Sequence, residues 1–599
     1  MPMSALASKS LLALALGAAL AVPAPAQESA TVPAATATPT SSPAKGTGGD
    51  IVGYGQIHHP VIGRGGMVVS QNRIATQVGA EILRKGGNAV DAAVATGFAL
   101  AVTLPRAGNV GGGGYMLVHM AATSERPAQT IAIDYYGQAP AATTPTLLLG
   151  EKGKFDAAKG MSMKGVAIPG TVMGLWEAHR RYGRLKWGTL LAPAIALARK
   201  GVALSDDEAE AHADQKELMA DDPAATAIFF RPDGTAWRAG DPFRQVDLAW
   251  TLSQIARKGP DGFYKGAVAD RIVSGMKNGG GIITHADLAN YRAIVSEPIW
   301  SSYRGRQIAY MPPTASGVSV AEAMNILENF PIERMQWGSA ASLHTIAEAV
   351  KIASSDRRFV GGLPDWRTPS KGLASKEYAA ERASLIRPDR SLDADSLPDG
   401  NPYPHESKDT THFSVADQWG NAVSNTYTLS ASYGAHVVAP GTGVLLNNSL
   451  GNLAWEKRDG VDRKATLPVP GKRVGSTITP LIVFEDGRPW IVSGTPGGGY
   501  IIATMVQLLS NVIDHGLNIA EAAQRPRINQ GSGEAPLEYE MGFSPDLIAL
   551  LERLGHKTRP SNTMGSVQSI MVDRGEDGTS RFLGAADTRR PDALAKGVR

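Results

Sequence analysis

Apolar and polar residues follow two periods along this chain, which together predict a mixture of strands and helices. Residues 66–70 predict a short strand, and residues 74–85 place their apolar side chains on one face of a helix. Residues 89–102 are apolar nearly all round and predict a buried helix. Further helices are predicted over residues 171–182, 190–200, 268–277, 340–354, 501–513 and 545–554.

The second half of the chain alternates more strongly between apolar and polar residues. Strand pairs are predicted at residues 411–415 with 422–428, 481–484 with 490–493, and 569–572 with 581–584. Strands flanked by helices in both halves favour a layered α/β sandwich.

The N-terminus has the pattern of a targeting segment. Residues 1–26 combine Lys9 with the apolar run Leu11–Val22 and with Ala24-Pro25-Ala26, which suits a small-residue cleavage site. The run is too short to span a bilayer well, and a buried helix is the alternative interpretation. Residues 27–50 are rich in Ala, Thr, Pro and Ser and predict a disordered linker. We therefore expect an exported protein, periplasmic or secreted, without a membrane span.

Composition excludes several kinds of chemistry. The 599 residues contain no cysteine, which removes disulfides, thiol catalysis and thiolate metal sites. The net charge is only +3, and no stripe of Lys and Arg predicts a nucleic-acid partner. The four glycines at 111–114 precede a strand, and no Lys-Ser/Thr follows them. A close-packed turn is therefore favoured over a phosphate loop.

The segment Asp409-Thr410-Thr411-His412-Phe413-Ser414 is the strongest indication of chemistry. If the bond between Asp409 and Thr410 is cut, Thr410 gains a free α-amino group beside its own hydroxyl. An amine of near-neutral pKa can take the proton of that hydroxyl and make it a nucleophile. The polar, proline-rich residues 389–409 suit an exposed, cleavable connector. The alternative is an ordinary strand threonine.

With that segment at its centre, the sequence resembles the γ-glutamyltransferase (glutathione hydrolase) family from about Gly66 to Gly584. The blocks that carry the resemblance, in order, are Gly86–Ala92, Gly111–Gly114, Val166–Gly170, Asp261–Tyr264, Asp356-Arg357, Pro496–Gly498 and Gly565–Ser569. Each block is weak by itself, but their order and separations make chance a poor explanation.

The resemblance implies the fold of N-terminal-nucleophile hydrolases, a four-layer αββα sandwich built from two autoprocessed subunits. The large subunit would be residues 51–409 and the small, catalytic subunit residues 410–599, and the two would stay associated through shared sheets. No metal or organic cofactor is implied. The expected partners are a small-molecule amide, as acyl donor, and water or an amine, as acceptor.

The resemblance also assigns roles to four catalytic residues. Thr410 would first attack the Asp409 carbonyl and then the acyl carbon of the substrate. Thr428 would orient the Thr410 hydroxyl, although a threonine also suits any strand. Gly497 and Gly498 would form an oxyanion hole, with a plain Pro-Gly turn as the alternative. His412 is expected to be structural, because the α-amino group already serves as the base.

The sequence departs from the family at the residues that recognise the γ-glutamyl group. Tyr136 stands where the family has an arginine that clamps the substrate carboxylate, and tyrosine cannot replace that charge. Asn452 stands in place of the acid that pairs with the substrate ammonium, and Ser430 replaces an asparagine. Only the serine pair that helps hold the carboxylate is partly kept, as Ser476-Thr477. We therefore expect weak activity on glutathione.

Three functions follow from this sequence. The first is an autoprocessed γ-glutamyltransferase-like amidase and acyltransferase of the glutathione hydrolase type. The second is an acylase of the same fold that acts on non-γ-glutamyl amides, as cephalosporin-acylase-like members do. The third is a non-catalytic exported binding protein, and retention of Thr410, Thr428 and the glycine pair argues against it. A serine hydrolase with a Gly-x-Ser-x-Gly motif and a His-Glu-x-x-His zinc enzyme are both disfavoured, because neither motif is found.

Overall fold

A computed structural model describes residues 56–357, 360, 368–393, 410–456, 467–575 and 577–599. The predicted targeting segment, the predicted linker, Asp409 and most of the connector lie outside these ranges. The described chain forms one compact unit.

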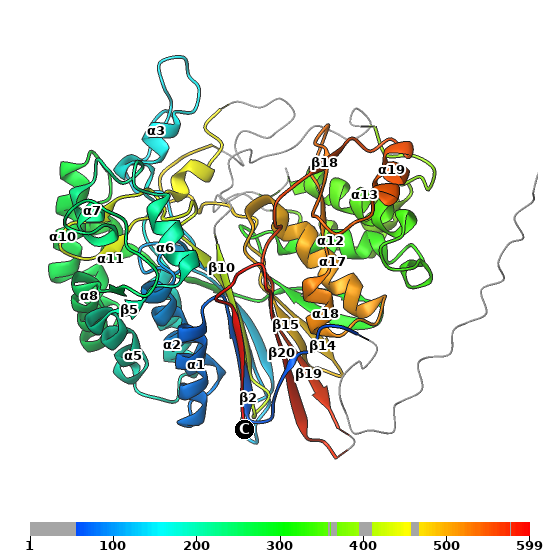
Figure 1. The fold of residues 1–599 in the computed structure, drawn as a ribbon, viewed down its shortest axis with the longest axis horizontal. Helices are drawn as coiled ribbons and strands as arrows, with labels where there is room; N and C mark the ends of the chain where they lie inside the picture. The colour runs from blue at the N-terminus through cyan, green and yellow to red at the C-terminus, as the bar shows by residue number, and fades with distance from the viewer. Residues whose placement is uncertain (1–55, 358–359, 361–367, 394–409, 457–466, 576) are drawn as a thin grey trace, which may run out of the picture. The chain divides into compact units, whose positions relative to one another are not determined.

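Two seven-stranded sheets stack at the centre of the molecule (Figure 1). The first has the order β21 (Leu594–Val598), β2 (Gly66–Ser70), β10 (Thr411–Asp417), β11 (Ala422–Thr428), β3 (Gly113–Met120), β4 (Gln129–Asp134) and β7 (Ile294–Ser296). The second has the order β1 (Val61–Gly63), β20 (Ser580–Ala586), β19 (Gln568–Arg574), β15 (Arg488–Ser493), β14 (Leu481–Glu485), β9 (Arg306–Tyr310) and β8 (Ile299–Tyr303). All of these neighbouring strands are antiparallel.

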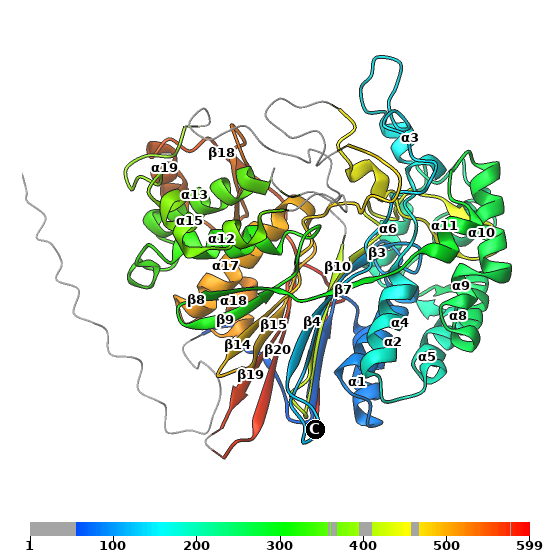
Figure 2. The same cartoon turned by 180° about the vertical axis from the view of Figure 1, so that it is seen from behind.

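Helices cover the outer face of each sheet, which completes four layers, αββα (Figures 1 and 2). The first sheet carries α1 (Arg73–Arg84), α2 (Ala89–Thr103), α4 (Thr171–Tyr182), α5 (Trp187–Lys200) and α8 (Val246–Lys258). The second carries α12 (Gly317–Leu327), α13 (Ala340–Asp356) and α17 (Ile501–Ile513). The remaining α-helices of the described residues are α3 (Ala157–Gly160), α6 (Asp206–Ala213), α7 (Pro223–Phe229), α9 (Asp261–Tyr264), α10 (Gly266–Asn278), α11 (His285–Asn290), α14 (Ser370–Leu373), α15 (Lys376–Ala383), α18 (Ile519–Gln524) and α19 (Pro545–Arg553). Within the described ranges, no helix is long and apolar enough to cross a bilayer.

Helix α2 shows how local sequence sets the elements. Asn88 caps its first turn, and Asp91 returns a bond to the Asn88 N–H, so the two side chains form a capping box. The Asp91 carboxylate also accepts hydrogen bonds from the N–H groups of Arg184 and Leu185. Its burial is therefore compensated by hydrogen bonds to the backbone. Every residue of α2 is buried, as its uniform apolar character predicted.

Some element predictions need correction. The predicted helix over 190–200 begins three residues earlier, at Trp187, and continues through Pro193. Gly113 and Gly114 belong to β3 rather than to a turn before it. Glycine is needed at 114, because a Cβ there would lie 2.4 Å from the Thr426 carbonyl oxygen of β11. Helix α8 and strand β21 were not predicted.

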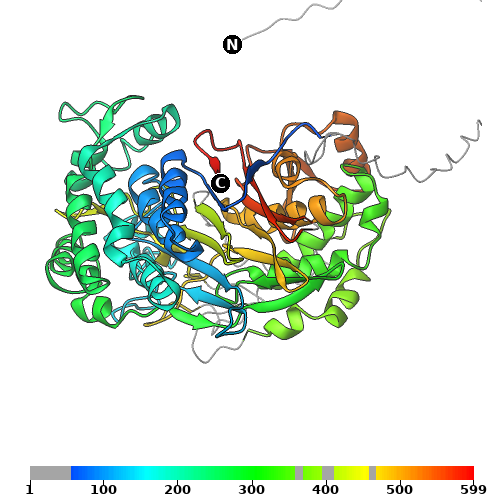
Figure 3. The ribbon, with the colours of Figure 1, turned by 90° about the horizontal axis from the view of Figure 1, so that it is seen from below.

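Strands from before and after Thr410 are interleaved in both sheets. In the first sheet β2 lies between β21 and β10, and in the second β1 pairs with β20 at the edge (Figure 3). If the chain is cut before Thr410, neither product keeps a complete sheet by itself. The two predicted subunits would therefore stay bound to each other.

Four buried histidines predict a loss of stability in acid. Burial lowers the pKa of His119 to about 4 and the pKa values of His212, His412 and His556 to about 3. An unfolded histidine titrates near 6.5, so between these pH values the unfolded chain binds more protons than the folded chain. Stability is therefore full above about pH 6.5 and falls by roughly 1.4 kcal/mol per pH unit for each such histidine as the pH drops below that value.

Thermal unfolding scans from pH 7.5 to 4.5 should show this fall. His212→Phe should flatten it, because His212 lies among Phe229, Phe243 and Tyr433 and neither ring nitrogen is hydrogen-bonded within the described residues. His285→Phe is the matched control, since that ring is exposed. Equal slopes for the two variants would contradict the prediction.

Candidate active site

Thr410 and Thr428 face each other at one end of two central strands. Strands β10 and β11 pair antiparallel with Thr411 opposite Tyr427, which brings Thr410 next to Thr428. The two hydroxyl oxygens are 3.4 Å apart, with Thr410 as donor. Both side chains are buried, at 5% and 1% exposure. The structure therefore brings together the predicted nucleophile and the hydroxyl predicted to orient it.

A chain of polar contacts continues from Thr428 to three predicted substrate-binding residues. The Ser430 N–H donates to the Thr428 hydroxyl at 2.9 Å, and the Ser430 hydroxyl donates to the Asn452 carbonyl oxygen at 3.2 Å. The Asn452 amide then meets the Tyr136 hydroxyl at 3.5 Å. Thr428 and Ser430 thus form one connected row with Asn452 and with the distant Tyr136, and none of the four carries a formal charge at neutral pH.

Tyr136 is held firmly in this row. Its ring stacks on Tyr115 with centroids 5.2 Å apart, and its carbonyl accepts Arg473 Nη1 at 2.6 Å and the Tyr291 hydroxyl at 2.8 Å. Arg473 also donates to the Tyr291 hydroxyl and to the Arg292 carbonyl. Both terminal nitrogens of this buried guanidinium are therefore occupied by the protein itself.

Ser476 is connected to the site through Thr314 and Tyr115. The Ser476 N–H donates to the Thr314 carbonyl at 3.1 Å, and the Thr314 hydroxyl is 2.9 Å from the Tyr115 hydroxyl. The Ser476 hydroxyl accepts the Ile478 N–H at 3.3 Å. Ser476 and Thr477 are both buried, and Ser476 lies one tyrosine away from Tyr136.

Gly497 and Gly498 form a tight turn just before helix α17. Their φ angles are 131° and 54°, and a Cβ at Gly497 would lie 3.0 Å from the Gly565 Cα. Only glycine suits this geometry without strain. Neither N–H donates to another described residue, so both are available to an oxyanion. The turn follows β15, which faces β10 and β11, since Ser414 and Ser424 both donate to β15 carbonyls.

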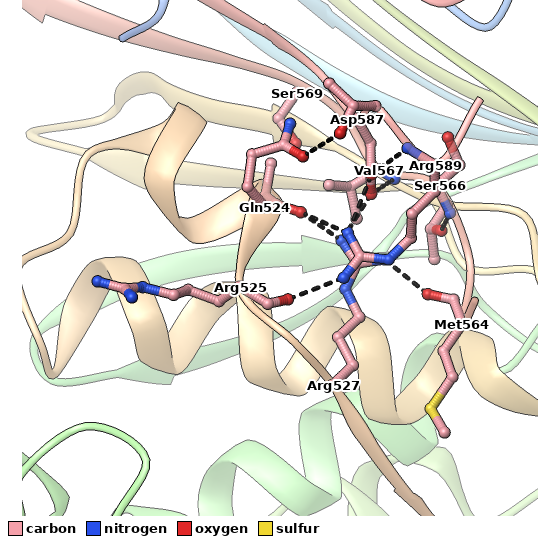
Figure 4. A network of polar contacts seen from close by, with 12 residues as sticks. Gln524, Arg525, Arg527, Met564, Ser566, Val567, Ser569, Asp587 and Arg589 are labelled. Carbon is pink, nitrogen blue, oxygen red and sulfur yellow. Dashed lines mark hydrogen bonds and ion pairs between the residues drawn. The ribbon is translucent and has the colours of Figure 1, made fainter. Parts of the chain in front are cut away.

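A buried ionic network supports the loop behind this turn (Figure 4). Asp587 accepts the Val567 N–H at 3.0 Å and the guanidinium groups of Arg527 at 2.6 Å and Arg589 at 3.0 Å. Arg527 also donates to the Met564 carbonyl at 2.6 Å. The two arginines hold the pKa of Asp587 below its usual range. Asp587 is therefore a charged anchor of residues 564–567, against which Gly497 packs.

His412 is structural, as the sequence predicted. Its Nδ1 lies 2.7 Å from the Thr426 hydroxyl and its Nε2 lies 3.0 Å from the Ser414 hydroxyl. Burial lowers its pKa to about 3, so the ring stays neutral at physiological pH. The ring packs against Gly494, where a Cβ would lie only 2.5 Å away. His412 thus bonds to β10 and β11 of the first sheet and packs against the residue that follows β15 of the second.

Known proteins are similar to this chain over most of its length. A family model described as gamma-glutamyltranspeptidase matches residues 75–597. The glutathione hydrolase proenzyme of Escherichia coli (strain K12) is 41% identical over 562 residues, which cover 91% of this chain and 94% of that protein. The chain belongs to the gamma-glutamyltranspeptidase family. It is therefore an enzyme of the N-terminal-nucleophile hydrolase class, with the αββα fold that the sequence predicted.

Acylases of this family are also similar to the chain. The acylase ACY 1 proenzyme of Pseudomonas sp. (strain SE83) is 36% identical over 554 residues, covering 90% of this chain and 95% of that protein. The crystal structure of cephalosporin acylase from Bacillus halodurans superposes with a TM-score of 0.79 at 29% identity, covering 94% of this chain and 99% of that chain. The fold by itself therefore does not select the acyl group.

Sequence reasoning missed the residues that support the site. Arg473 and Thr314 lie in loops, and their partners are backbone carbonyls or a tyrosine hydroxyl distant in sequence. Asp356 belongs to a block that carries the family resemblance, but the sequence does not predict its contacts. The carboxylate binds the Tyr378 hydroxyl at 2.7 Å and Arg382 at 2.9 Å, away from the site residues.

One other cluster holds metal-capable side chains. Among the described residues, His344, Glu348 and His556 place possible ligand atoms within 4.8 Å of one another. Glu348 already accepts Lys351 Nζ at 2.8 Å and the Ser391 hydroxyl at 2.9 Å. The lysine ammonium supplies the positive charge that a metal ion would bring. We therefore assign no metal to this cluster.

Thr428→Val should slow the enzyme without unfolding it. Valine keeps the volume of threonine but removes the hydroxyl that accepts from Thr410 and from the Ser430 N–H. Loss of one such hydrogen bond predicts a three- to tenfold lower kcat, at about 1 kcal/mol. Steady-state kinetics of the purified variant measure this effect. Thr428→Ser, which keeps the hydroxyl, is the control and should retain most of the activity; equal rates for wild type and Thr428→Val would exclude an orienting role.

Proposed function

We propose that this chain is a proenzyme that cleaves itself between Asp409 and Thr410 and then acts as an amidase and acyltransferase of the γ-glutamyl type. The observation that carries the proposal is the position of Thr410, at the head of β10 with its hydroxyl 3.4 Å from that of Thr428. The similarity to a glutathione hydrolase proenzyme over nearly the whole chain supports it.

In the processing step, the Thr410 hydroxyl adds to the Asp409 carbonyl carbon and displaces the Thr410 nitrogen, so the amide becomes an ester. Water then hydrolyses this ester, which leaves a carboxylate on Asp409 and a free amine and hydroxyl on Thr410. The large chain, which contains residues 51–409, and the small chain, 410–599, share both sheets and remain associated.

In the catalytic step, the same hydroxyl attacks the acyl carbon of an amide while the α-amino group takes its proton. Gly497 and Gly498 offer their free N–H groups to the oxygen that becomes negative. The amine leaves with the proton, and the acyl group remains as an ester on Thr410. Water or an acceptor amine then attacks this ester and regenerates the hydroxyl.

A second candidate is an acylase for amides whose acyl part has no charged amino-acid head. The neutral row of Ser430, Asn452 and Tyr136 favours it, because a buried carboxylate or ammonium without an opposite charge is costly. Arg473 does not supply the missing cation to a substrate, since its terminal nitrogens bind Tyr136, Tyr291 and Arg292. This candidate uses the same Thr410 chemistry.

A panel of anilides distinguishes the candidates. Mature protein, expected to be exported and to begin at Gln27, is assayed on γ-glutamyl, glutaryl and hexanoyl p-nitroanilides and on glutathione, with and without glycylglycine as acceptor. Fast turnover of glutathione supports the first candidate, and preference for glutaryl or hexanoyl groups supports the second. A single unprocessed chain without any turnover would refute both and leave a binding protein.

A further inference from the structure

The backbone that follows Thr428 has an unusual conformation. Within seven residues, Ser430, Tyr433, Gly434 and His436 have φ angles of 85°, 55°, 60° and 59°. Three of these are not glycine, and each left-handed residue of that kind costs free energy that its surroundings must offset. We call residues 430–436 the left-handed segment. It contains Ser430, whose hydroxyl donates to Asn452 in the connected row of Thr428, Ser430, Asn452 and Tyr136.

Tyr433 attaches the middle of this segment to the rest of the fold. Its N–H donates to the Arg106 carbonyl at 3.0 Å, and its ring is completely buried. The ring lies edge-on to Phe229, with centroids 5.5 Å apart, and to His212, at 5.8 Å. These two residues come from helices α7 and α6, which therefore pack directly on the left-handed segment.

Arg106 is fixed in turn by helix α6. Its guanidinium forms ion pairs with Asp207 and, at 2.8 Å, with Glu208. The arginine side chain is only 9% exposed and that of Glu208 only 3%, so these charges depend on each other. Helix α6 thus fixes Arg106 through these ion pairs, and the Arg106 carbonyl in turn accepts the Tyr433 N–H.

We propose that Tyr433 and Arg106 are positioning residues of the acyl site, which act by holding the left-handed segment so that Ser430 and Asn452 meet the acyl end of the substrate. The proposal rests on the function proposed above and adds the module of α6 and α7 to the site. Neither residue touches the reacting atoms. Their loss should weaken binding of the acyl donor equally in ground and transition states, and so raise KM more than it lowers kcat.

Tyr433→Leu and Arg106→Met test this role. Both variants should still process into two chains, since Thr410 and Thr428 are untouched. KM for the p-nitroanilide that the wild type cleaves best should rise roughly five- to tenfold, which corresponds to a weakened hydrogen bond at Ser430, with kcat changed less than about twofold. Tyr433→Phe and Arg106→Lys should restore most of the lost affinity.

Matched controls come from the same module. Phe230→Leu removes a similarly buried ring of the same core cluster, and Arg231→Met breaks the Arg231–Asp241 ion pair. Both should lower Tm without changing KM. The proposal is overturned if the controls raise KM as much as Tyr433→Leu and Arg106→Met do, if KM of these two is unchanged, or if both remain unprocessed. Because each result is a ratio to the wild type on its own best substrate, a wrong assignment of the acyl group leaves the test valid.

Discussion

Thr410→Ala should yield a single, uncut and inactive chain. Alanine keeps the strand but removes the hydroxyl that must attack the Asp409 carbonyl, so neither the ester nor the free amine can form. We expect activity at least a thousandfold below the wild type, because the nucleophile is lost together with the base. A denaturing gel followed over days, with mass determination of each band, measures the cleavage. Thr410→Ser keeps a hydroxyl and should process and react slowly.

The neighbouring threonine provides a sharp control. Thr411 is fully buried in β10, and its hydroxyl has no hydrogen-bond partner among the described residues. Thr411→Val should therefore process and react as the wild type does, with equal or higher stability, because it removes an unsatisfied buried hydroxyl. Cleavage of Thr410→Ala before residue 410, or a small chain of the wild type that starts elsewhere, would refute the mechanism.

Much of the fold was predictable because its elements have strong, simple patterns. Helix α2 is apolar on every side and has its own cap, and β10 and β11 alternate around a short turn. The sheet order was not readable from these patterns, since β2 pairs with β10 across more than half of the chain. Helix α8 was missed although its core residues Leu248, Ala249, Leu252 and Ile255 have helical spacing.

The candidate site was predictable at residues whose role requires a particular backbone bond or a particular backbone conformation. Thr410 needs a cleavable bond, and Gly497 needs a conformation that only glycine adopts easily. The support of the site was not predictable, because it depends on which carbonyls and hydroxyls come together after folding. The stack of Tyr136 on Tyr115 and the bond of Tyr433 to Arg106 both join segments with no common pattern.

Exchanging two neutral residues for charged ones should change the preferred acyl group. In Tyr136→Arg/Asn452→Asp, a guanidinium and a carboxylate would replace a phenol and an amide that are now 3.5 Å apart. The arginine would pair with the α-carboxylate of a γ-glutamyl group and the aspartate with its α-ammonium. Arginine binds a carboxylate especially strongly, because it can donate two parallel hydrogen bonds to it. We expect the ratio of kcat/KM for γ-glutamyl to hexanoyl p-nitroanilide, whose acyl group has neither charge, to rise about a hundredfold, on the scale of discrimination that matched polar groups provide.

Each single variant should be less stable and less active than the double variant. Tyr136 is 1% exposed and Asn452 is 7% exposed, so one new charge would be buried without its opposite. Both single variants should therefore lose Tm and activity on every anilide, and the double variant should recover Tm. Asn448→Asp adds the same charge four residues away, where the side chain caps the Ala431 N–H at 2.8 Å rather than meeting Tyr136. If Asn448→Asp shifts the substrate ratio as far as the double variant does, or the double variant does not shift it, the neutral row does not set the acyl preference.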